Sequence, residues 1–175
     1  PIPIEKMRTI QKRCQTNDDE PRWLVALISD TGMRLSEAAG LAKEDVVLDA
    51  DIPHVIIRPH PWRRLKTKGS ERILPLVGCS LWAAKRAVET SQQSPHLFPR
   101  YCNNKGCRAN SASAALNKWL KQTIGDDYVM HSFRHSMRDR LRAVNCPSEM
   151  IDQIGGWSKT SVGEGYGEGY TISQL

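Results

Sequence analysis

The 175-residue sequence has no long apolar run and few cysteines. No stretch approaches the roughly 20 apolar residues that a membrane-spanning helix needs, and the N-terminus lacks the apolar core of a signal peptide. The five cysteines are odd in number and scattered, which argues against a disulfide framework and favours a reducing compartment. We therefore expect a cytoplasmic protein with no membrane partner.

Several catalytic signatures are also missing. There is no glycine-rich phosphate loop, no HExxH and no GxSxG motif. Clustered carboxylates that would bind two magnesium ions are lacking, which disfavours a two-metal nuclease. Cys102 and Cys107, with His96 nearby, leave a structural zinc site open, although the CNNKGC spacing is wider than usual and no second ligand pair follows. The sequence therefore predicts neither a metal nor a nucleotide cofactor.

What the chain does have is a basic balance and enough apolar residues for one core. It carries 25 Lys and Arg against 19 Asp and Glu, a formal charge of +6, which favours acidic partners such as nucleic acid. Its length and its 39% hydrophobic content fit a single domain over residues 1–175.

The apolar pattern predicts a mainly helical domain with one small antiparallel β-hairpin, which is the α+β class. Two short β-rich runs, 54–58 and 72–76, flank a basic loop and form the expected hairpin. Long helices are expected over 21–30, 81–90, 111–124 and 131–144. Two shorter ones are expected to be capped by Ser36 and by Ser148.

The helix over 131–144 carries the most informative pattern. At about 100° per residue, one stripe of it is apolar, formed by Phe133, Met137, Leu141 and Val144. The adjacent face is basic and comprises His131, Arg134, His135, Arg138 and Arg142. An HxxR pair sets an imidazole and a guanidinium one turn apart, where both can donate to one phosphate. A solvated surface would account for the same residues, so both interpretations stay open.

Two other segments offer cations. Arg34, in TGMRLSE, follows a predicted helix end, where it would project into a cleft or pair with Glu37. The loop LKTKGSER holds Lys66 and Lys68. A lysine at such a tip either keeps the hairpin soluble or, in a DNA groove, protonates a leaving oxygen.

The stretch GGWSKTSVGEGYGEGY, residues 155–170, contains six of the chain's 12 glycines together with Trp157, Tyr166 and Tyr170. It is either a disordered end or a mobile arm with a reactive side chain. Many cations, few carboxylates and a late tyrosine suit phosphoryl transfer by a tyrosine hydroxyl, because arginine and imidazole stabilise the transition-state charge without a metal. A covalent phosphotyrosine keeps the energy of the broken bond, which favours cutting and rejoining DNA over hydrolysis.

In this order, the motifs resemble the catalytic domain of the tyrosine recombinases, and phage integrases most closely, from about residue 22 to residue 170. TGMRLSEAAGL resembles the first box of the family, which implies Arg34 as a catalytic arginine and Glu37 as its acidic partner. HSFRH is similar to the second box and implies His131 and Arg134. IGGWS puts Trp157 where histidine is commoner, so an indole N–H and packing replace any acid/base role.

The resemblance also implies a nucleophile nine residues after the third-box position, which selects Tyr166 and leaves Tyr170 as the alternate. KTKGSERILPL resembles the hairpin of the catalytic lysine, and Lys66 is preferred there to Lys68. A supporting role is implied for His135. DNA-backbone contacts are expected from Arg138, Arg142 and Lys68.

The implied function is site-specific recombination or integration of double-stranded DNA through a 3′-phosphotyrosine, in the cytoplasm of a bacterial host. Attachment sites, a synaptic oligomer of the protein and accessory DNA-bending proteins are the expected partners. The abrupt start at PIPIEKM suggests a fragment without the family's N-terminal DNA-clamping domain, and 155–175 is the expected mobile segment with the nucleophile. Two alternatives stay open, a type IB topoisomerase-like relaxation activity and a non-catalytic DNA-binding module.

Overall fold

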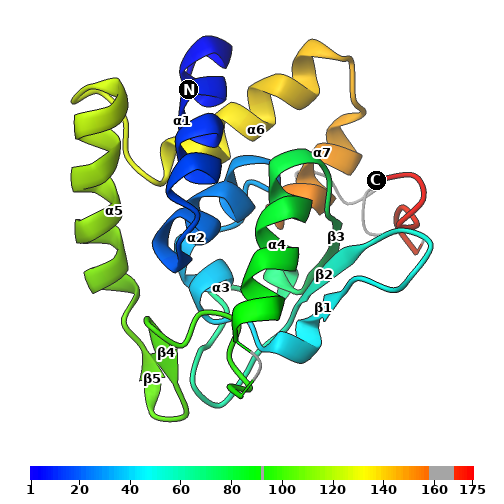
Figure 1. Cartoon of the computed structure of the whole chain (residues 1–175). Helices are drawn as coiled ribbons and strands as arrows, with labels where there is room; N and C mark the ends of the chain where they lie inside the picture. The colour runs from blue at the N-terminus through cyan, green and yellow to red at the C-terminus, as the bar shows by residue number, and fades with distance from the viewer. Residues whose placement is uncertain (92, 158–167) are drawn as a thin grey trace.

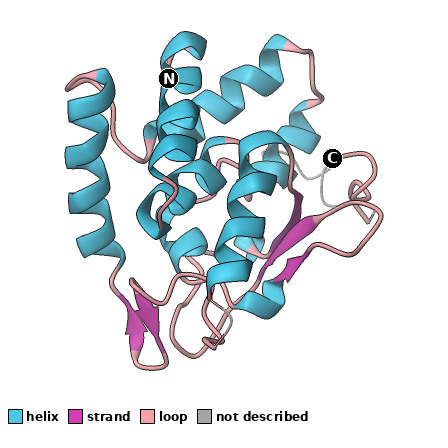
Figure 2. Ribbon diagram, viewed as in Figure 1, coloured by secondary structure: helices cyan, strands magenta, loops and turns pink. Residues whose placement is uncertain are grey.

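Helices dominate the fold and two small sheets lie at its edge (Figures 1 and 2). The computed structural model describes residues 1–91, 93–157 and 168–175. Within these ranges the α-helices are α1 (Ile4–Asn17), α2 (Glu20–Ser29), α3 (Leu35–Ala39), α4 (Gly78–Thr90), α5 (Ala109–Ile124), α6 (Ser132–Ala143) and α7 (Ser148–Gly155). This arrangement confirms the predicted mainly helical α+β class.

Helix α2 is the centre of the core. The Asp19 side chain accepts the Arg22 N–H at 3.1 Å and so caps its first turn, and Pro21 lies in that turn, where its missing N–H costs nothing. From Trp23 to Ser29 every residue is buried, because α1, α4, α5 and α6 pack around this helix (Figure 1). The predicted buried helix over 21–30 is confirmed.

The larger sheet is antiparallel, in the order β1-β2-β3, and β2 and β3 form the predicted hairpin. Alternate residues Val55, Ile57 and Leu74 face the core, whereas Ile73 is 42% exposed. A second hairpin, β4-β5, has no counterpart in the sequence prediction. The strands are β1 (Val46–Val47), β2 (His54–Ile57), β3 (Arg72–Pro75), β4 (Cys102–Asn103) and β5 (Gly106–Cys107), and two 3-10 turns cover Lys43–Asp45 (η1) and Lys68–Ser70 (η2).

Three local predictions are wrong. Ser36 lies inside α3, whose N-cap residue is Arg34, and Glu37 closes the first turn by accepting the Arg34 N–H. Ser148 is the first residue of α7 and makes no capping hydrogen bond, since Pro147 occupies the N-cap position. Val144 is 73% exposed, because α6 ends at Ala143 and the apolar stripe therefore ends one turn earlier.

Cys102 and Cys107 form a disulfide across the β4-β5 hairpin. This bond was not predicted from the sequence, and it removes both thiolates as ligands of the zinc site considered there. Across 1–91, 93–157 and 168–175, no group of three or more His, Cys, Asp or Glu is arranged to hold a metal ion. In those same ranges, no helix has the length and apolar character to cross a bilayer.

Candidate active site

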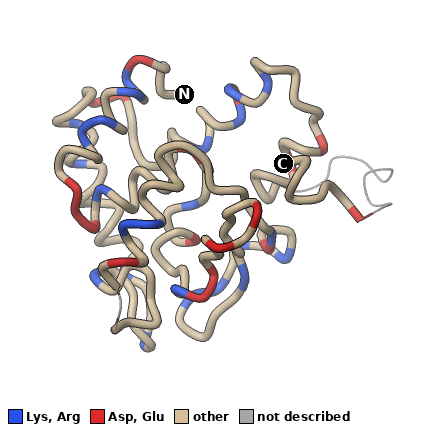
Figure 3. The backbone as a smooth tube through the Cα atoms, turned by 45° about the vertical axis from the view of Figure 1, so that its right-hand side comes forward, with Lys and Arg blue, Asp and Glu red and all other residues tan. Residues whose placement is uncertain are grey.

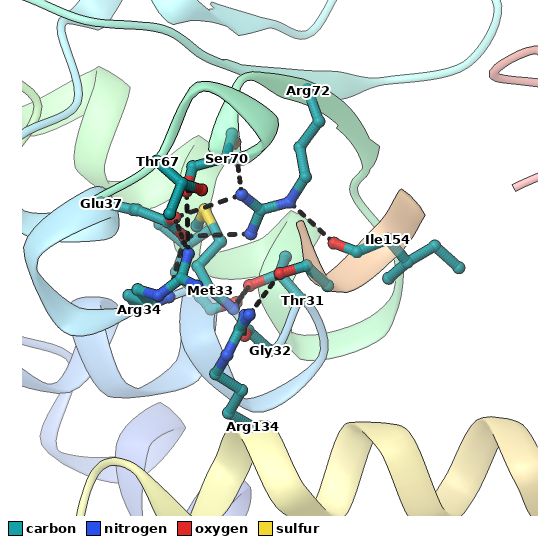
Figure 4. A network of polar contacts seen from close by, with 12 residues as sticks. Thr31, Gly32, Met33, Arg34, Glu37, Thr67, Ser70, Arg72, Arg134 and Ile154 are labelled. Carbon is teal, nitrogen blue, oxygen red and sulfur yellow. Dashed lines mark hydrogen bonds and ion pairs between the residues drawn. The ribbon is translucent and has the colours of Figure 1, made fainter. Parts of the chain in front are cut away.

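A buried carboxylate, Glu37, lies at the centre of an arginine cluster (Figure 4). Arg72 donates to both of its oxygens, from Nη2 to Oε2 at 2.9 Å and from Nη1 to Oε1 at 3.2 Å. Arg34 donates its Nη1 to Oε1 at 2.8 Å as well as its backbone N–H. Burial opposes ionisation of Glu37, but the hydrogen bonds and charges of Arg72 and Arg34 outweigh it and lower the pKa of this carboxyl.

Arg72 joins the hairpin to two other elements. Its Nε donates to the Ile154 carbonyl of α7 at 2.8 Å, and its Nη1 to the Ser70 carbonyl at 2.6 Å. Gly156 caps α7 at φ +60°, and a Cβ there would lie 2.7 Å from Arg72 Nη1. The second glycine of IGGWS is therefore needed both for the left-handed turn and for the close approach of α7 to Arg72.

Arg134 points from α6 into the fold and is only 3% exposed. Its Nη1 donates to the Gly32 carbonyl at 3.1 Å, and its Nη2 donates to the Gly155 carbonyl. Burial and the nearby charges of Arg34 and Arg72 lower the pKa of Arg134 to about 10, which leaves the guanidinium charged at pH 7. The second-box arginine thus meets the first box and the end of α7.

Positive charge exceeds negative charge at this cluster. Arg34, Arg72 and Arg134 interact with one another through their charges, and Glu37 is the carboxylate that faces them among the described residues. Lys and Arg are also spread over the rest of the backbone, where Asp and Glu are interspersed with them (Figure 3). Clustered guanidinium groups with a side chain still 19% exposed, that of Arg34, suit an incoming phosphate.

Trp157 packs directly on the cluster. Its ring lies 4.3 Å from the guanidinium carbon of Arg134 and 5.0 Å from that of Arg138, both within cation–π range. The ring folds back over Gly155, where a Cβ would come 1.7 Å from it. The first glycine of IGGWS therefore makes room for the indole, and the indole covers one side of Arg134.

His131 precedes α6 and is exposed at the edge of the same cluster. Its ring meets that of His135 edge-on, with centroids 5.0 Å apart. Partial burial and nearby positive charge lower its pKa, which favours the neutral imidazole at pH 7. The charges responsible belong, in decreasing order of effect, to His135, Arg134, Arg34 and Lys66.

Lys66 and Arg34 line one open cleft of about 670 Å³. Lys68 instead begins the turn η2, where it is exposed. The cleft residues come from the first box, the basic hairpin loop, strand β5 and the start of α5. They are Arg34, Ser36, Trp62, Arg63, Arg64, Leu65, Lys66, Cys107 and Ala109.

The remaining predicted residues lie in different settings. Tyr166 lies outside the described residues. Tyr170 is partly buried, with its main chain hydrogen-bonded to Gln153. Arg142 is exposed and lies 4.0 Å from Asp139.

Comparison with known proteins places this arrangement in a family. The model of the phage integrase family matches residues 3–168. The chain belongs to the phage integrase family. Family membership confirms the resemblance to the tyrosine recombinases seen in the sequence motifs. The tyrosine recombinase XerD of Corynebacterium glutamicum is 29% identical over 159 residues, which are 85% of this chain and 48% of that protein. The chain thus spans about half the length of this relative of the family.

Solved structures share the fold. The crystal structure of XerA recombinase superposes with a TM-score of 0.71 at 16% identity, over 90% of this chain and 54% of that one. XerH site-specific recombinase, bound to a palindromic difH substrate, superposes with a TM-score of 0.66 at 19% identity, over 90% of this chain and 46% of that one. The Tn1549 transposon integrase, in complex with transposon right end DNA, superposes with a TM-score of 0.62 at 16% identity, over 91% of this chain and 58% of that one. These likenesses confirm the predicted tyrosine-recombinase catalytic-domain fold.

Sequence reasoning missed Arg72. The sequence pattern assigns Arg72 to the start of a β-rich run, whereas in the structure its guanidinium also bridges Glu37 and α7. No local pattern distinguishes Arg72 from another basic residue at the end of a short strand, because its partners come from other elements. Gln153 was missed too, since a lone glutamine in a short helix carries no pattern.

Proposed function

We propose that this chain is the catalytic domain of a site-specific DNA recombinase that cuts and rejoins duplex DNA through a 3′-phosphotyrosine. The observation that carries the proposal is the meeting of Arg34 and Arg134, 100 positions apart in the sequence, around a buried carboxylate with positive charge in excess. A scissile phosphate supplies the missing negative charge.

Each candidate residue has a role in this chemistry. Tyr166 attacks phosphorus, its oxygen forms the new P–O bond, and the bond to the 5′-oxygen breaks. Arg34 and Arg134 stabilise the charge on the non-bridging oxygens, and Glu37 orients Arg34. His131 is kept neutral by its lowered pKa, so it can accept the tyrosine proton.

Lys66 is the proposed general acid for the leaving 5′-hydroxyl. Two observations support Lys66 over Lys68. Lys66 lines the same cleft as Arg34, and its charge is one of those that lower the pKa of His131. Trp157 supports the phosphate site through Arg134, His135 borders it, and Arg138 and Arg142 contact the DNA backbone with Lys68. The chemistry needs no cofactor.

Recombination further requires attachment sites, a synaptic assembly of several protomers and, in our proposal, DNA-bending accessory proteins in the cytoplasm of a bacterial host. XerH bound to difH and the Tn1549 integrase bound to transposon end DNA support DNA as the partner. The arginine cluster with its adjacent cleft favours catalysis over a purely DNA-binding module.

The test is covalent capture. The full-length protein is incubated with a nicked suicide duplex of its attachment site, and adducts are separated on a denaturing gel. We expect an adduct that disappears in Tyr166→Phe and persists in Tyr170→Phe. The reverse pattern would move the nucleophile to Tyr170. No adduct with either tyrosine intact would favour the DNA-binding module, and relaxation of supercoiled DNA without strand exchange would favour a topoisomerase.

A further inference from the structure

The short helix α3 ends against the basic loop, residues 58–71, which joins β2 to β3. The Trp62 indole N–H donates to the carbonyl of Gly40, the C-cap residue of α3, at 2.9 Å. The next residue of the loop, Arg63, donates its Nη1 to the Glu37 carbonyl at 3.3 Å. Two consecutive loop residues therefore bind carbonyls at the C-terminal end of α3, where a helix has no donors of its own to offer them.

Arg63 is buried at this junction, with only 5% of its surface exposed. Its Nη2 donates to the Arg58 carbonyl at 2.9 Å, and a Cβ on Gly40 would lie 2.7 Å from Arg63 Cγ. Gly40 has an ordinary φ of −92°, so glycine is needed here for the close approach of Arg63 and not for the turn. Burial lowers the pKa of Arg63, and the negative charges of Glu37 and Asp45 partly offset that effect.

Lys66 lies between two attachments of the basic loop to the first box. It follows Arg63 by three residues, and the loop returns to Arg34 directly after it. Arg34 donates its Nη1 to Ser70 Oγ at 3.2 Å, and the Ser70 and Thr67 hydroxyls are hydrogen-bonded at 3.0 Å (Figure 4). Because Arg34 is the N-cap residue of α3, the two ends of this helix hold the loop on either side of Lys66.

We propose that Arg63 is a positioning residue for the general acid Lys66, because its contacts with the end of α3 fix the loop where Lys66 faces a phosphate bound at Arg34. This inference rests on the proposed function. A proton donor held beside the leaving oxygen acts at a high effective concentration, whereas an unattached loop would spread the ammonium group over a larger volume. Arg63 offers DNA little surface, so it acts through the loop.

The first measurement tests the contact between the loop and α3 in the absence of DNA. The Trp62 indole N–H should exchange slowly with deuterated water, and Gly40→Ala should remove this protection because the new Cβ displaces Arg63. Gly69→Ala is the matched control, since no atom lies within 4 Å of the Cβ position of this loop glycine. Equal exchange in the unmodified protein and in Gly40→Ala would overturn the inference at this step.

The second measurement compares two leaving groups in single-turnover cleavage of the nicked duplex by the full-length protein. One duplex carries the natural 5′-oxygen at the scissile phosphate, and in the other duplex sulfur replaces that oxygen. When the P–O bond breaks, the 5′-oxygen needs a proton from Lys66. When the P–S bond breaks, the electron pair leaves on sulfur as a thiolate, which is stable without a proton. Sulfur therefore rescues a variant whose defect lies in proton donation.

On the oxygen duplex, we expect Arg63→Met to be about 10-fold slower than the unmodified protein and Lys66→Ala about 100-fold slower. Arg63→Met keeps an unbranched buried stem but loses the guanidinium hydrogen bonds. Arg63→Lys retains one donor group and should restore part of the rate. On the sulfur duplex all three variants should react at the unmodified rate. Circular dichroism at the assay temperature confirms that each variant is folded.

Two controls bracket this result. Arg34→Ala should stay about 100-fold slow on both duplexes, because it removes a phosphate ligand and not the proton donor. Arg58→Ala keeps the carbonyl that binds Arg63 and should cut both duplexes at the unmodified rate.

A defect of Arg63→Met that persists on the sulfur duplex would assign Arg63 to the phosphate site or to the fold as a whole and would overturn the inference. An unchanged rate of Arg63→Met on the oxygen duplex would overturn it too. Failure of the proposed function gives a different pattern. The unmodified protein would then form no adduct with either duplex, or Lys66→Ala would cut the oxygen duplex at the normal rate, and the inference would fall with the function on which it rests.

Discussion

Two buried carboxylates, Glu37 and Asp45, gather basic side chains in this fold, but the two clusters differ in charge balance and in depth. Asp45 is fully buried and accepts the Ala42 N–H at 2.9 Å, Arg58 Nε at 2.7 Å and His60 Nε2 at 2.6 Å. Arg58 also pairs with Glu44 at 3.3 Å and keeps 38% of its side chain exposed.

At Glu37 the partners are deeper and outnumber the carboxylate. The Arg72 side chain is 4% exposed, and Arg134 adds a third guanidinium whose own hydrogen bonds go to carbonyls. A cluster whose charges cancel stabilises a loop. A cluster that keeps buried positive charge in excess is adapted to an anion that arrives later. The difference explains why similar residues form structure in one place and a candidate active site in the other.

The largest expected difference between the clusters is in stability. Glu37→Gln should lower the free energy of unfolding by about 3–5 kcal/mol, because Arg72 would be left buried without a counter-charge. Asp45→Asn should cost only about 1–3 kcal/mol, since Arg58 can turn to Glu44 and to water. Urea unfolding at pH 7 measures both. Equal losses would contradict the distinction.

The pH dependence of the Glu37 contribution has a definite sign. Arg72 and Arg34 lower its folded-state pKa below the usual 4.5, so the stabilisation is present above pH 4.5. It is lost as the pH falls through the lower folded-state value. In a plot of the free energy of unfolding against pH, Glu37→Gln should therefore reduce the slope below pH 4.5.

Cleavage should separate the clusters next. Arg134→Ala or Arg34→Ala should slow single-turnover cleavage by about 100-fold or more, as for other preorganised charge donors. Arg58→Ala, in the Asp45 cluster, should leave the rate unchanged. If Arg134→Ala or Arg34→Ala lost only DNA affinity while bound DNA was cut at the normal rate, that arginine would be a contact to the DNA backbone and not a catalytic residue.

Binding of a free anion to the arginine cluster around Glu37 tests the excess of positive charge there, with a smaller expected effect on stability. Sulfate at several times its dissociation constant should stabilise the unmodified protein by about 1 kcal/mol relative to chloride at equal ionic strength. Arg134→Ala should abolish this gain and Arg58→Ala should retain it. Thermal unfolding in the two salts measures the effect, and a gain that survives in Arg134→Ala would place the sulfate elsewhere.

The sequence was informative where local pattern and chemistry coincide. Periodicity predicted α2, the hairpin and the helix that carries Arg134, and the motif order predicted roles for Arg34 and His131. The contact of Arg134 with Gly32 joins positions 102 apart, and no local pattern encodes such a distance. For the same reason, Arg72 and Gln153 emerged only from the structure, because their partners come from other elements.

Local geometry explains what the sequence prediction missed at the helix cap and at the disulfide. Ser36 has the side chain of a helix cap, but Glu37 fills that role because its carboxylate is already held beside the Arg34 N–H. Cys102 and Cys107 are too few for a framework, yet the turn between them brings their Cα atoms to 4.2 Å. Composition counts residues, whereas capping and pairing depend on geometry that only the folded chain supplies.

The smallest expected effect is on the pKa of His131, an exposed residue at the edge of the arginine cluster. Its folded-state pKa is lowered below 6.5 by partial burial and by its basic neighbours, so acidification protonates the unfolded chain first. Its contribution to stability therefore falls as the pH drops from above 6.5 through the folded-state value.

Removing a neighbouring charge with Lys66→Ala should raise the His131 pKa in an NMR titration, while Lys68→Ala should leave it unchanged. Bound sulfate should raise it too, because a negative charge beside the ring favours the imidazolium. A His131 pKa that responds to Lys68 and not to Lys66 would reverse the choice of general acid.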